Sequence, residues 1–434
     1  MSDKPPLLEI RNLKKYFEQN SSIVDMLLRR EPNRVQAVDN VSLTLEENES
    51  IAVIGESGCG KTTLLLTLIG LHDITGGDIV YKGKPVSEFT KPEWKRYRRN
   101  VQVVFQDPFN SLDPKMTIEE TLQEPLKIHG IGNREQRVRD VLEHVELNPP
   151  EKYLRRKPRN LSGGEKQRVS IARALILEPD VILADEPVSM LDVSTQAAVL
   201  RQMKELIEDF GVSMIYISHD LSTVSYISDM VNVMYLGRIV ETAPTERILS
   251  DPKHPYTEAL VSAVPIPDPS HDRDRTRMSG APRDPVDLDE GCRFRDRCPS
   301  VIPPDTIEID QEAYREIIEF RELLERDEIA FERVKNTLDK SYPDDRKMAE
   351  AIREDYFTHE LTGENNAVLK EALIAFVNEK PDAATELLRE RFESVCETSP
   401  PTVENEDGWY VACHHYDRGV TDMQIDQPET AQSD

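Results

Sequence analysis

Short apolar runs alternate with stretches of helical periodicity over the first 250 residues. The runs at residues 51–54, 181–184 and 214–217 are uninterrupted and of strand length, and residues 196–210 are typical of the helical stretches between them. Strands without polar alternation are buried on both faces, as in a parallel sheet covered by helices. The pattern therefore predicts an α/β core.

Two segments of this first half differ from the core pattern. Residues 8–13 and 41–45 alternate apolar and polar side chains, and the gap between them is polar and carries Pro32. We expect them to form an antiparallel β subdomain ahead of the core. Residues 107–164 are helical and polar, so we expect a helical subdomain there.

The second half begins with a stretch rich in Pro, Asp and Arg at residues 251–285, which predicts a linker. We therefore expect one domain over residues 1–252 and a second region over 253–434. Residues 301–394 are acidic and show helical spacing of apolar positions, so we expect amphipathic helices there. Composition alone favours a packing module without chemistry. The apolar positions at helical spacing are Ile317, Phe320, Leu324, Phe331, Val334, Leu338, Leu369, Leu373 and Phe376.

Charge and hydropathy narrow the class of function. The 54 Lys and Arg against 81 Asp and Glu give a net charge of −27, which argues against a nucleic-acid-binding surface. The acidity is spread along the chain, so it indicates either a high-salt cytoplasm of a halophile or an ordinary acidic protein. Without an apolar stretch of about 18 residues or a signal peptide, we expect a soluble cytoplasmic chain.

A glycine-rich loop at residues 55–62 lies between the first apolar run and a predicted helix. Backbone N–H groups of such a loop cradle phosphates, while Lys61 supplies a positive charge and Thr62 a hydroxyl for Mg²⁺. Cys59 occupies a free position of the pattern, and we expect its side chain to be inert. The residues expected to contact a bound triphosphate here are Gly55, Ser57, Gly58, Cys59, Gly60, Lys61, Thr62 and Thr63.

Two carboxylates follow the apolar run at residues 181–184, at the strand end where ligands of open α/β sheets collect. Asp185 can hold Mg²⁺, and Glu186 can accept a proton from an attacking water or orient it. The alternative is a structural acidic pair. His219 follows the next strand and could reach the γ-phosphate, although a histidine in that place is more often structural.

Ser162, Gly163 and Gly164 form a second candidate anion site. Ser162 can cap a helix whose first turn lacks side chains, and such a helix end binds anions. Taken alone, Ser-Gly-Gly is a common loop sequence.

The order of these motifs resembles ATP-binding-cassette (ABC) ATPases over roughly the first 250 residues. The resemblance implies a head-to-tail dimer in which Ser162, Gly163 and Gly164 contact the ATP of the partner subunit and Asp192 links the two sites. It also implies that Gln106 senses Mg²⁺ and couples hydrolysis to a permease. An aromatic residue should stack on adenine, either Phe17 or its neighbour Tyr16.

A narrower resemblance is to the ATP-binding subunits of oligopeptide and dipeptide importers, the second of their two paired ATPases. It rests on residues 111–114, 185–188, 254–257, 264–269 and 291–299. It implies ATP hydrolysis that powers solute import through two transmembrane permeases at the cytoplasmic face of the membrane, with an extracellular binding protein upstream. Peptides are the expected solute, and nickel complexes and oligosaccharides are alternatives. A soluble ABC ATPase or an exporter cassette fits less well, because the chain shows neither a second cassette nor membrane spans.

Four of the five cysteines lie in the second half. Residues 301–394, which depart from the importer family and resemble an insertion, separate them into two pairs. Four thiolates suit zinc or an iron–sulfur cluster, but gaps of five and sixteen residues differ from the knuckles of structural zinc. The resemblance to the importer family implies a [4Fe–4S] cluster on Cys292, Cys298, Cys396 and Cys413, with zinc or unligated thiols as alternatives. We expect His414 and His415, beside Cys413, to lie at the surface.

Overall fold

The computed structural model describes residues 4–18, 33–108, 111–264, 278, 280–286, 288, 291–326, 329, 345–401 and 409–417. The predicted helical positions Phe331, Val334 and Leu338 lie outside these residues, as do Pro32 and nearly all of residues 264–269. In the described part, no helix combines the length and the apolar character that crossing a membrane requires.

A seven-stranded sheet forms the centre of the molecule, in the order β11-β10-β9-β3-β8-β7-β6. Its parallel strands are β3 (Ser50–Ile54), β6 (Val101–Val104), β7 (Val181–Asp185), β8 (Ser213–Ser218) and β9 (Met230–Tyr235). All residues of β3, β7 and β8 are buried, which is the reason for their continuous apolar sequences. The predicted α/β core is confirmed.

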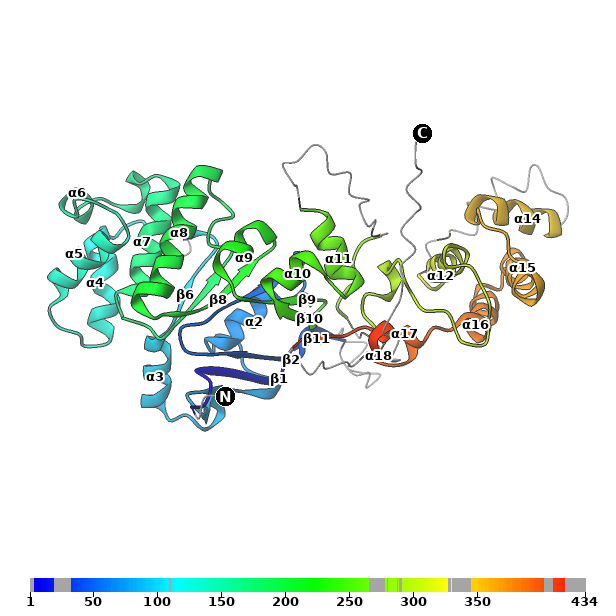
Figure 1. Cartoon of the computed structure of the whole chain (residues 1–434), viewed down its shortest axis with the longest axis horizontal. Helices are drawn as coiled ribbons and strands as arrows, with labels where there is room; N and C mark the ends of the chain where they lie inside the picture. The colour runs from blue at the N-terminus through cyan, green and yellow to red at the C-terminus, as the bar shows by residue number, and fades with distance from the viewer. Residues whose placement is uncertain are drawn as a thin grey trace, which may run out of the picture.

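Helices cover this sheet and form a separate lobe (Figure 1). The helices beside the sheet are α2 (Lys61–Leu68), α3 (Lys91–Asn100), α8 (Val193–Phe210), α9 (Leu221–Ile227), α10 (Thr245–Ser250) and α11 (Pro255–Ser262). The lobe contains α4 (Ile118–Ile128), α5 (Arg134–His144) and α6 (Glu151–Leu154), which pack with α7 (Gly163–Leu175). Helices therefore occur where the polar periodicity of residues 107–164 predicted them.

A second, antiparallel sheet has the order β2-β1-β4-β5. The strands β1 (Leu8–Glu18) and β2 (Arg34–Leu45) pair antiparallel, as their alternating sequences predicted, and Leu8 lies opposite Leu45. The strands β4 (Gly76–Tyr81) and β5 (Lys84–Pro85) complete the sheet from beyond the glycine-rich loop. These two strands were not predicted.

The C-terminal region extends away from the central sheet (Figure 1). It contains the single turn η4 (Arg295–Arg297) and the helices α12 (Gln311–Glu325), α14 (Asp345–Tyr356), α15 (Gly363–Val377), α16 (Pro381–Phe392), α17 (Val395–Thr398) and α18 (His414–Asp417). Ile317, Phe320 and Leu324 of α12 and Leu369, Leu373 and Phe376 of α15 are buried. The helical periodicity predicted for these positions is therefore correct.

After the insertion, the chain returns to the central sheet. The short strand β11 (Tyr410–Val411) pairs antiparallel with β10 (Arg238–Pro244), so that Tyr410 lies opposite Thr242. One apolar cluster runs continuously from Ala52 in β3 to Cys396 in α17. The predicted boundary between residues 252 and 253 stays a prediction, but the two regions it separates share a core and a sheet.

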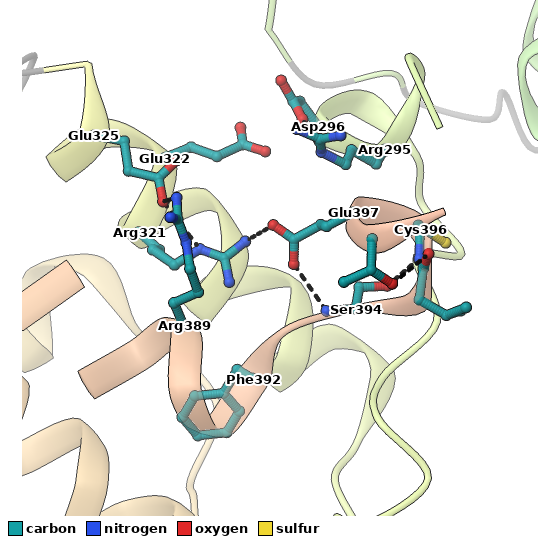
Figure 2. Close-up of polar contacts among 12 residues, drawn as sticks. Arg295, Asp296, Arg321, Glu322, Glu325, Arg389, Phe392, Ser394, Cys396 and Glu397 are labelled. Carbon is teal, nitrogen blue, oxygen red and sulfur yellow. Dashed lines mark hydrogen bonds and ion pairs between the residues drawn. The ribbon is translucent and has the colours of Figure 1, made fainter. Parts of the chain in front are cut away.

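Arg321 of α12 ties the insertion to the segment that carries Cys396 (Figure 2). Its side chain is 1% exposed and pairs with Glu397 and Glu325. Glu397 accepts a hydrogen bond from the N–H of Ser394 at 2.8 Å, and the Ser394 hydroxyl accepts one from the N–H of Cys396 at 3.0 Å. Contacts from α12 therefore continue to the backbone of a cysteine.

Substitution of Arg321 by Met should lower the free energy of unfolding of this region by about 3 kcal/mol, because it leaves the carboxylate of Glu397 in a largely buried place without its cation. Urea unfolding followed by circular dichroism measures the change. Arg389→Met is the matched control, since Arg389 pairs with Glu325 at 2.7 Å but is 56% exposed. We expect the control to cost less than about 1 kcal/mol, and equal losses in both variants would contradict the role of Arg321.

Candidate phosphate site and cysteine site

The glycine-rich loop connects β3 to α2, and two of its glycines are required by their surroundings. Gly55 has φ 154° and Gly60 has φ 110°. A Cβ atom on Gly55 would lie 2.1 Å from the carbonyl oxygen of Met234, and one on Gly60 would lie 2.0 Å from that of Ala37. At Gly58 no atom lies within 4 Å of the Cβ position. Close backbone packing therefore restricts Gly55 and Gly60, whereas Gly58 is limited only by its φ of 82°.

Lys61, the first residue of α2, is buried and lies across this loop. Its Nζ donates to the carbonyl oxygens of Gly55 at 2.7 Å and Glu56 at 2.9 Å. The ammonium group is thus held where the loop would meet a phosphate. The thiol of Cys59 is also buried, and burial raises its pKa. A protonated thiol is a poor nucleophile, which agrees with an inert side chain.

Thr62 and Asp185 form the first polar contact between the loop and the carboxyl ends of the strands. The Thr62 hydroxyl donates to Oδ2 of Asp185 at 3.0 Å. Burial raises the pKa of Asp185, so a cation beside it would be favoured because it would offset the cost of burying the charged carboxylate. Two of the three predicted Mg²⁺ ligands, Thr62 and Asp185, therefore lie together.

Glu186 is the centre of the second contact. Its Oε2 accepts a hydrogen bond from Nε2 of Gln106 at 3.1 Å and lies 3.0 Å from Nδ1 of His219. Gln106 also donates to the Ser189 hydroxyl at 3.2 Å. The three predicted catalytic residues, Glu186, Gln106 and His219, thus meet although 113 positions separate the first and last of them in the chain.

The backbone of Glu186 has φ 45°, a left-handed conformation that costs energy for a residue with a side chain. Its N–H donates to the carbonyl oxygen of Ile217 in β8 at 2.9 Å, which helps to hold it in place. Residues kept in such conformations cluster at functional sites. The sequence offered no signal for this strain.

Ser162 caps α7 as predicted. Its hydroxyl accepts from the N–H of Glu165 at 3.2 Å, and the Glu165 carboxylate accepts from the N–H of Ser162 at 2.8 Å. The structure adds a packing reason for Gly164, because a Cβ atom there would lie 2.5 Å from Cγ2 of Thr195. Gly163 is under no such restriction, with Leu191 at 3.5 Å.

Asp192 caps the neighbouring helix α8. It accepts hydrogen bonds from the Ser194 hydroxyl at 2.6 Å and from the N–H of Thr195 at 3.1 Å. These hydrogen bonds to the charged form lower the pKa of Asp192 to about 2. The side chain is exposed and ionised, and its role across a dimer stays a prediction.

The two candidate adenine-stacking residues lie in different surroundings on β1. The Tyr16 hydroxyl donates to Asp39, which also binds Arg238 at 2.8 Å. The Phe17 ring packs edge-on against His72, with ring centroids 5.2 Å apart. Tyr16 is thus engaged in an ion-pair network and Phe17 is not. The choice of Phe17 stays a prediction.

The four C-terminal cysteines are free thiols that the fold brings near one another. The N–H of Cys292 donates to the carbonyl oxygen of Cys396 at 2.7 Å, across the whole insertion. Burial raises the pKa of Cys292 to about 11 and that of Cys413 to about 12, and it raises the pKa of Cys298 and Cys396 as well. Neighbouring thiolates add to the increase at Cys292, Cys298 and Cys413, which shows that these charges would lie close to other cysteines.

No three of the four sulfur atoms of these described cysteines all lie within 4.8 Å of one another. Tetrahedral zinc at about 2.3 Å from each sulfur places the sulfurs about 4 Å apart. Within the described residues, only Asp310, Glu312 and His359 bring three potential ligand atoms within 4.8 Å of one another, and they lie at the surface or near it.

His414 corrects one expectation. It was expected at the surface, but it is 4% exposed, and its Nε2 lies 3.0 Å from the carbonyl oxygen of Ser399. The prediction failed because the strand β11 returns this part of the chain to the core, a contact that residue type and local sequence do not indicate. His415 is partly exposed.

Family models match three parts of the chain. An ABC transporter model matches residues 38–189, and a model of the C-terminal region of oligopeptide/dipeptide transporters matches residues 240–303. A domain of unknown function (DUF8228) matches residues 311–409, which include the helices from α12 to α17.

Curated relatives match over nearly their whole length. A putative peptide import ATP-binding protein of Brucella ovis is 45% identical over 300 residues, which are 68% of this chain and 90% of the relative. The oligopeptide transport ATP-binding protein AppF of Bacillus subtilis is 42% identical over 70% of this chain and 92% of its own. The oligopeptide transport ATP-binding protein OppF of Escherichia coli is 44% identical over a match that covers 68% of this chain and 90% of OppF. The chain therefore belongs to the family of ATP-binding subunits of oligopeptide and dipeptide ABC transporters.

Proposed function

We propose that this chain hydrolyses ATP to drive the import of peptides through a membrane transporter. The observation that carries the proposal is the meeting of Gln106, Glu186 and His219 beside the Thr62–Asp185 pair, next to a glycine-rich loop. A glycine-rich loop alone indicates only a bound phosphate. The added carboxylate, amide and imidazole supply what the hydrolysis of a phosphoanhydride needs. Peptides are the proposed solute because the relatives are described as peptide transport proteins.

Each residue has a distinct task in this proposal. The phosphates contact the Lys61 ammonium and the loop residues Gly55, Ser57, Gly58, Cys59, Gly60, Thr62 and Thr63. Thr62, Asp185 and Gln106 would hold Mg²⁺, and this ion would supply positive charge against the charge that develops on the phosphates. Glu186 accepts a proton from the attacking water. His219 contacts the γ-phosphate from its position 3.0 Å from Glu186.

The active unit is a dimer with a second ATPase subunit, in which Ser162, Gly163 and Gly164 reach the ATP of the partner. The surface around Asp192 supports this proposal. Met190 is 68% exposed and Val193 is 82% exposed, so two large apolar side chains flank the helix cap. Burial of such a pair against a partner would be favourable. The dimer would sit on two permeases at the cytoplasmic face of the membrane, with the binding protein on the other side.

The cysteine site fits an iron–sulfur cluster better than a single zinc ion. Its four thiols are free, mostly buried and surrounded by apolar side chains, and their mutual repulsion as thiolates would be relieved by bound iron. We propose that Cys292, Cys298, Cys396 and Cys413 hold a [4Fe–4S] cluster. Such a cluster would link the cysteines that precede the insertion to those that follow it.

Replacement of Glu186 by Gln should reduce the ATPase rate of the assembled transporter at least about a hundredfold, because the amide cannot accept the proton of the attacking water. ATP binding should persist, since Glu186 does not form part of the phosphate loop. Phosphate release by the transporter with peptide-loaded binding protein measures the rate. Retained turnover would contradict the role of Glu186, and a failure of peptide to stimulate the unsubstituted transporter would contradict the proposed solute.

Gly60→Ala should abolish ATP binding, because its Cβ would collide with the carbonyl oxygen of Ala37 at 2.0 Å. Gly58→Ala is the matched control, since it meets no atom within 4 Å and costs only the strain of its positive φ, about 1 to 2 kcal/mol. Titration with a fluorescent ATP analogue compares the two variants. Equal affinities would show that the loop does not depend on this close packing.

The cluster predicts about four iron atoms and four acid-labile sulfides per chain in protein purified without oxygen. Cys396→Ser should lose most of the iron, whereas Cys59→Ser should retain it, because Cys59 lies in the phosphate loop away from the other four. Iron and sulfide assays measure both variants. Stoichiometric zinc without iron would overturn the assignment.

A further inference from the structure

The segment between the first two cysteines contacts the phosphate loop. We name residues 292–298 the cysteine loop; it contains the turn η4. The guanidinium of Arg297 donates to both carboxylate oxygens of Glu56, at 2.8 Å and 3.0 Å. Glu56 follows Gly55 in the phosphate loop. A residue adjacent to Cys298 therefore binds a residue of the nucleotide site 241 positions earlier in the chain.

This ion pair is well enclosed. The side chain of Arg297 is 8% exposed and that of Glu56 is 24% exposed, so solvent and salt screen the pair only weakly. The guanidinium lies over the ring of Tyr235, 5.9 Å from its centroid. The ring of Phe294, in the same cysteine loop, packs against the rings of Tyr235 and Tyr256, with centroid distances of 5.2 Å and 5.3 Å.

Glu56 is also held through its backbone. Its N–H donates to the hydroxyl of Tyr256 at 2.8 Å, and its carbonyl oxygen accepts from Lys61 at 2.9 Å. The residue that Arg297 fixes is thus in direct contact with the lysine that meets the phosphates. A shift of Glu56 would therefore move its own carboxylate and also the carbonyl oxygen that accepts the hydrogen bond of Lys61.

The charge of Glu56 gives the contact an effect on ATP. A free carboxylate in a loop that binds a triphosphate opposes the ligand by like-charge repulsion. A bidentate guanidinium cancels that charge and fixes the direction of the side chain. Arg297 therefore removes a repulsion that the phosphate loop would otherwise carry.

The cysteine loop is anchored at both of its ends and in its middle. The backbone N–H of Cys292 donates to the carbonyl oxygen of Cys396. The guanidinium of Arg315 in α12 donates to the carbonyl oxygen of Cys298. Arg326, just after α12, pairs with Asp296 at 3.0 Å. A displacement of Cys292 or Cys298 would therefore be passed on to Arg297, because the cysteine loop between them is short and is held by these contacts.

We propose that Arg297 is a positioning residue for ATP binding, acting through Glu56, and that the cysteine loop thereby makes the affinity for ATP depend on the state of the four cysteines. The first half of this statement rests on the proposed ATP site alone. The second half rests also on the proposed cluster.

The test is a double-mutant cycle on the full chain, read as the dissociation constant of the Mg²⁺ complex of the fluorescent analogue mant-ATP. Arg297→Met should weaken binding about tenfold, a size typical of coupling between two sites. Glu56→Gln should bind no more weakly than the unsubstituted protein, and the double variant should match Glu56→Gln within about twofold. Arg297→Lys, which keeps the charge, should recover part of the affinity.

Arg326→Met is the matched control, because it removes a different arginine–carboxylate pair from the same cysteine loop without touching Glu56. It should leave the dissociation constant unchanged. Thermal unfolding of every variant separates loss of structure from loss of affinity. Equal weakening in Arg297→Met and in the double variant would overturn the role of Arg297, because a merely structural contact is not rescued by removing its partner.

The dependence on the cysteines is tested by removing iron with a chelator under oxidising conditions. The unsubstituted protein should then lose affinity for mant-ATP severalfold, while the Glu56→Gln variant should not. An unchanged constant in iron-depleted protein would contradict the coupling. Protein that already contains no iron when it is purified without oxygen would contradict the cluster itself. The double-mutant cycle on Arg297 and Glu56 would still decide whether Arg297 is a positioning residue for ATP binding.

Discussion

The burial of the parallel strands β3, β7 and β8 on both faces of the central sheet is the constraint on which the nucleotide site depends. Parallel strands end at the same edge, so the residues that follow them must meet there. Thr62, Asp185, Glu186 and His219 follow three neighbouring strands, and their contacts of 3.0 Å are a consequence of that order. The left-handed backbone of Glu186 shows that the sheet holds this edge firmly enough to keep a strained residue in place.

The second constraint is the set of buried ion pairs between the cassette and the C-terminal region. Arg293, beside Cys292, pairs with Asp39 of β2 at 2.5 Å, and Arg297 pairs with Glu56. Buried pairs are costly to break, because each leaves a charge without a partner in a poorly solvated place. The cysteine loop is therefore fixed against both the antiparallel sheet and the phosphate loop. The composition predicted a separate region after the linker, but these ion pairs hold its first segment against the cassette.

The insertion, residues 301–394, is also connected to the rest of the protein by apolar packing and a buried ion pair. Its helices have an apolar core that is continuous with the core of the cassette, and Arg321 reaches Glu397 at its far end. Both ends of the insertion lie beside cysteines, so the arrangement of α12 and α17 decides whether the four thiols can meet. Stability of the helices and assembly of the cysteine site are consequently linked.

The sequence by itself determined the α/β core and the place of the glycine-rich loop after its first strand, because apolar runs and glycine spacing are local patterns. Its nucleotide-binding residues stay predictions. It also indicated amphipathic helices, since their periodicity is local. It missed β4, β5, β6, β9, β10 and β11, and it misplaced His414, because short strands and returning segments depend on partners far along the chain. Only the tertiary structure decided that Glu186 meets Gln106 and His219, that Gly164 is required by Thr195, and that Arg297 contacts Glu56. These contacts join distant residues, and no local pattern specifies which arginine a buried carboxylate will bind.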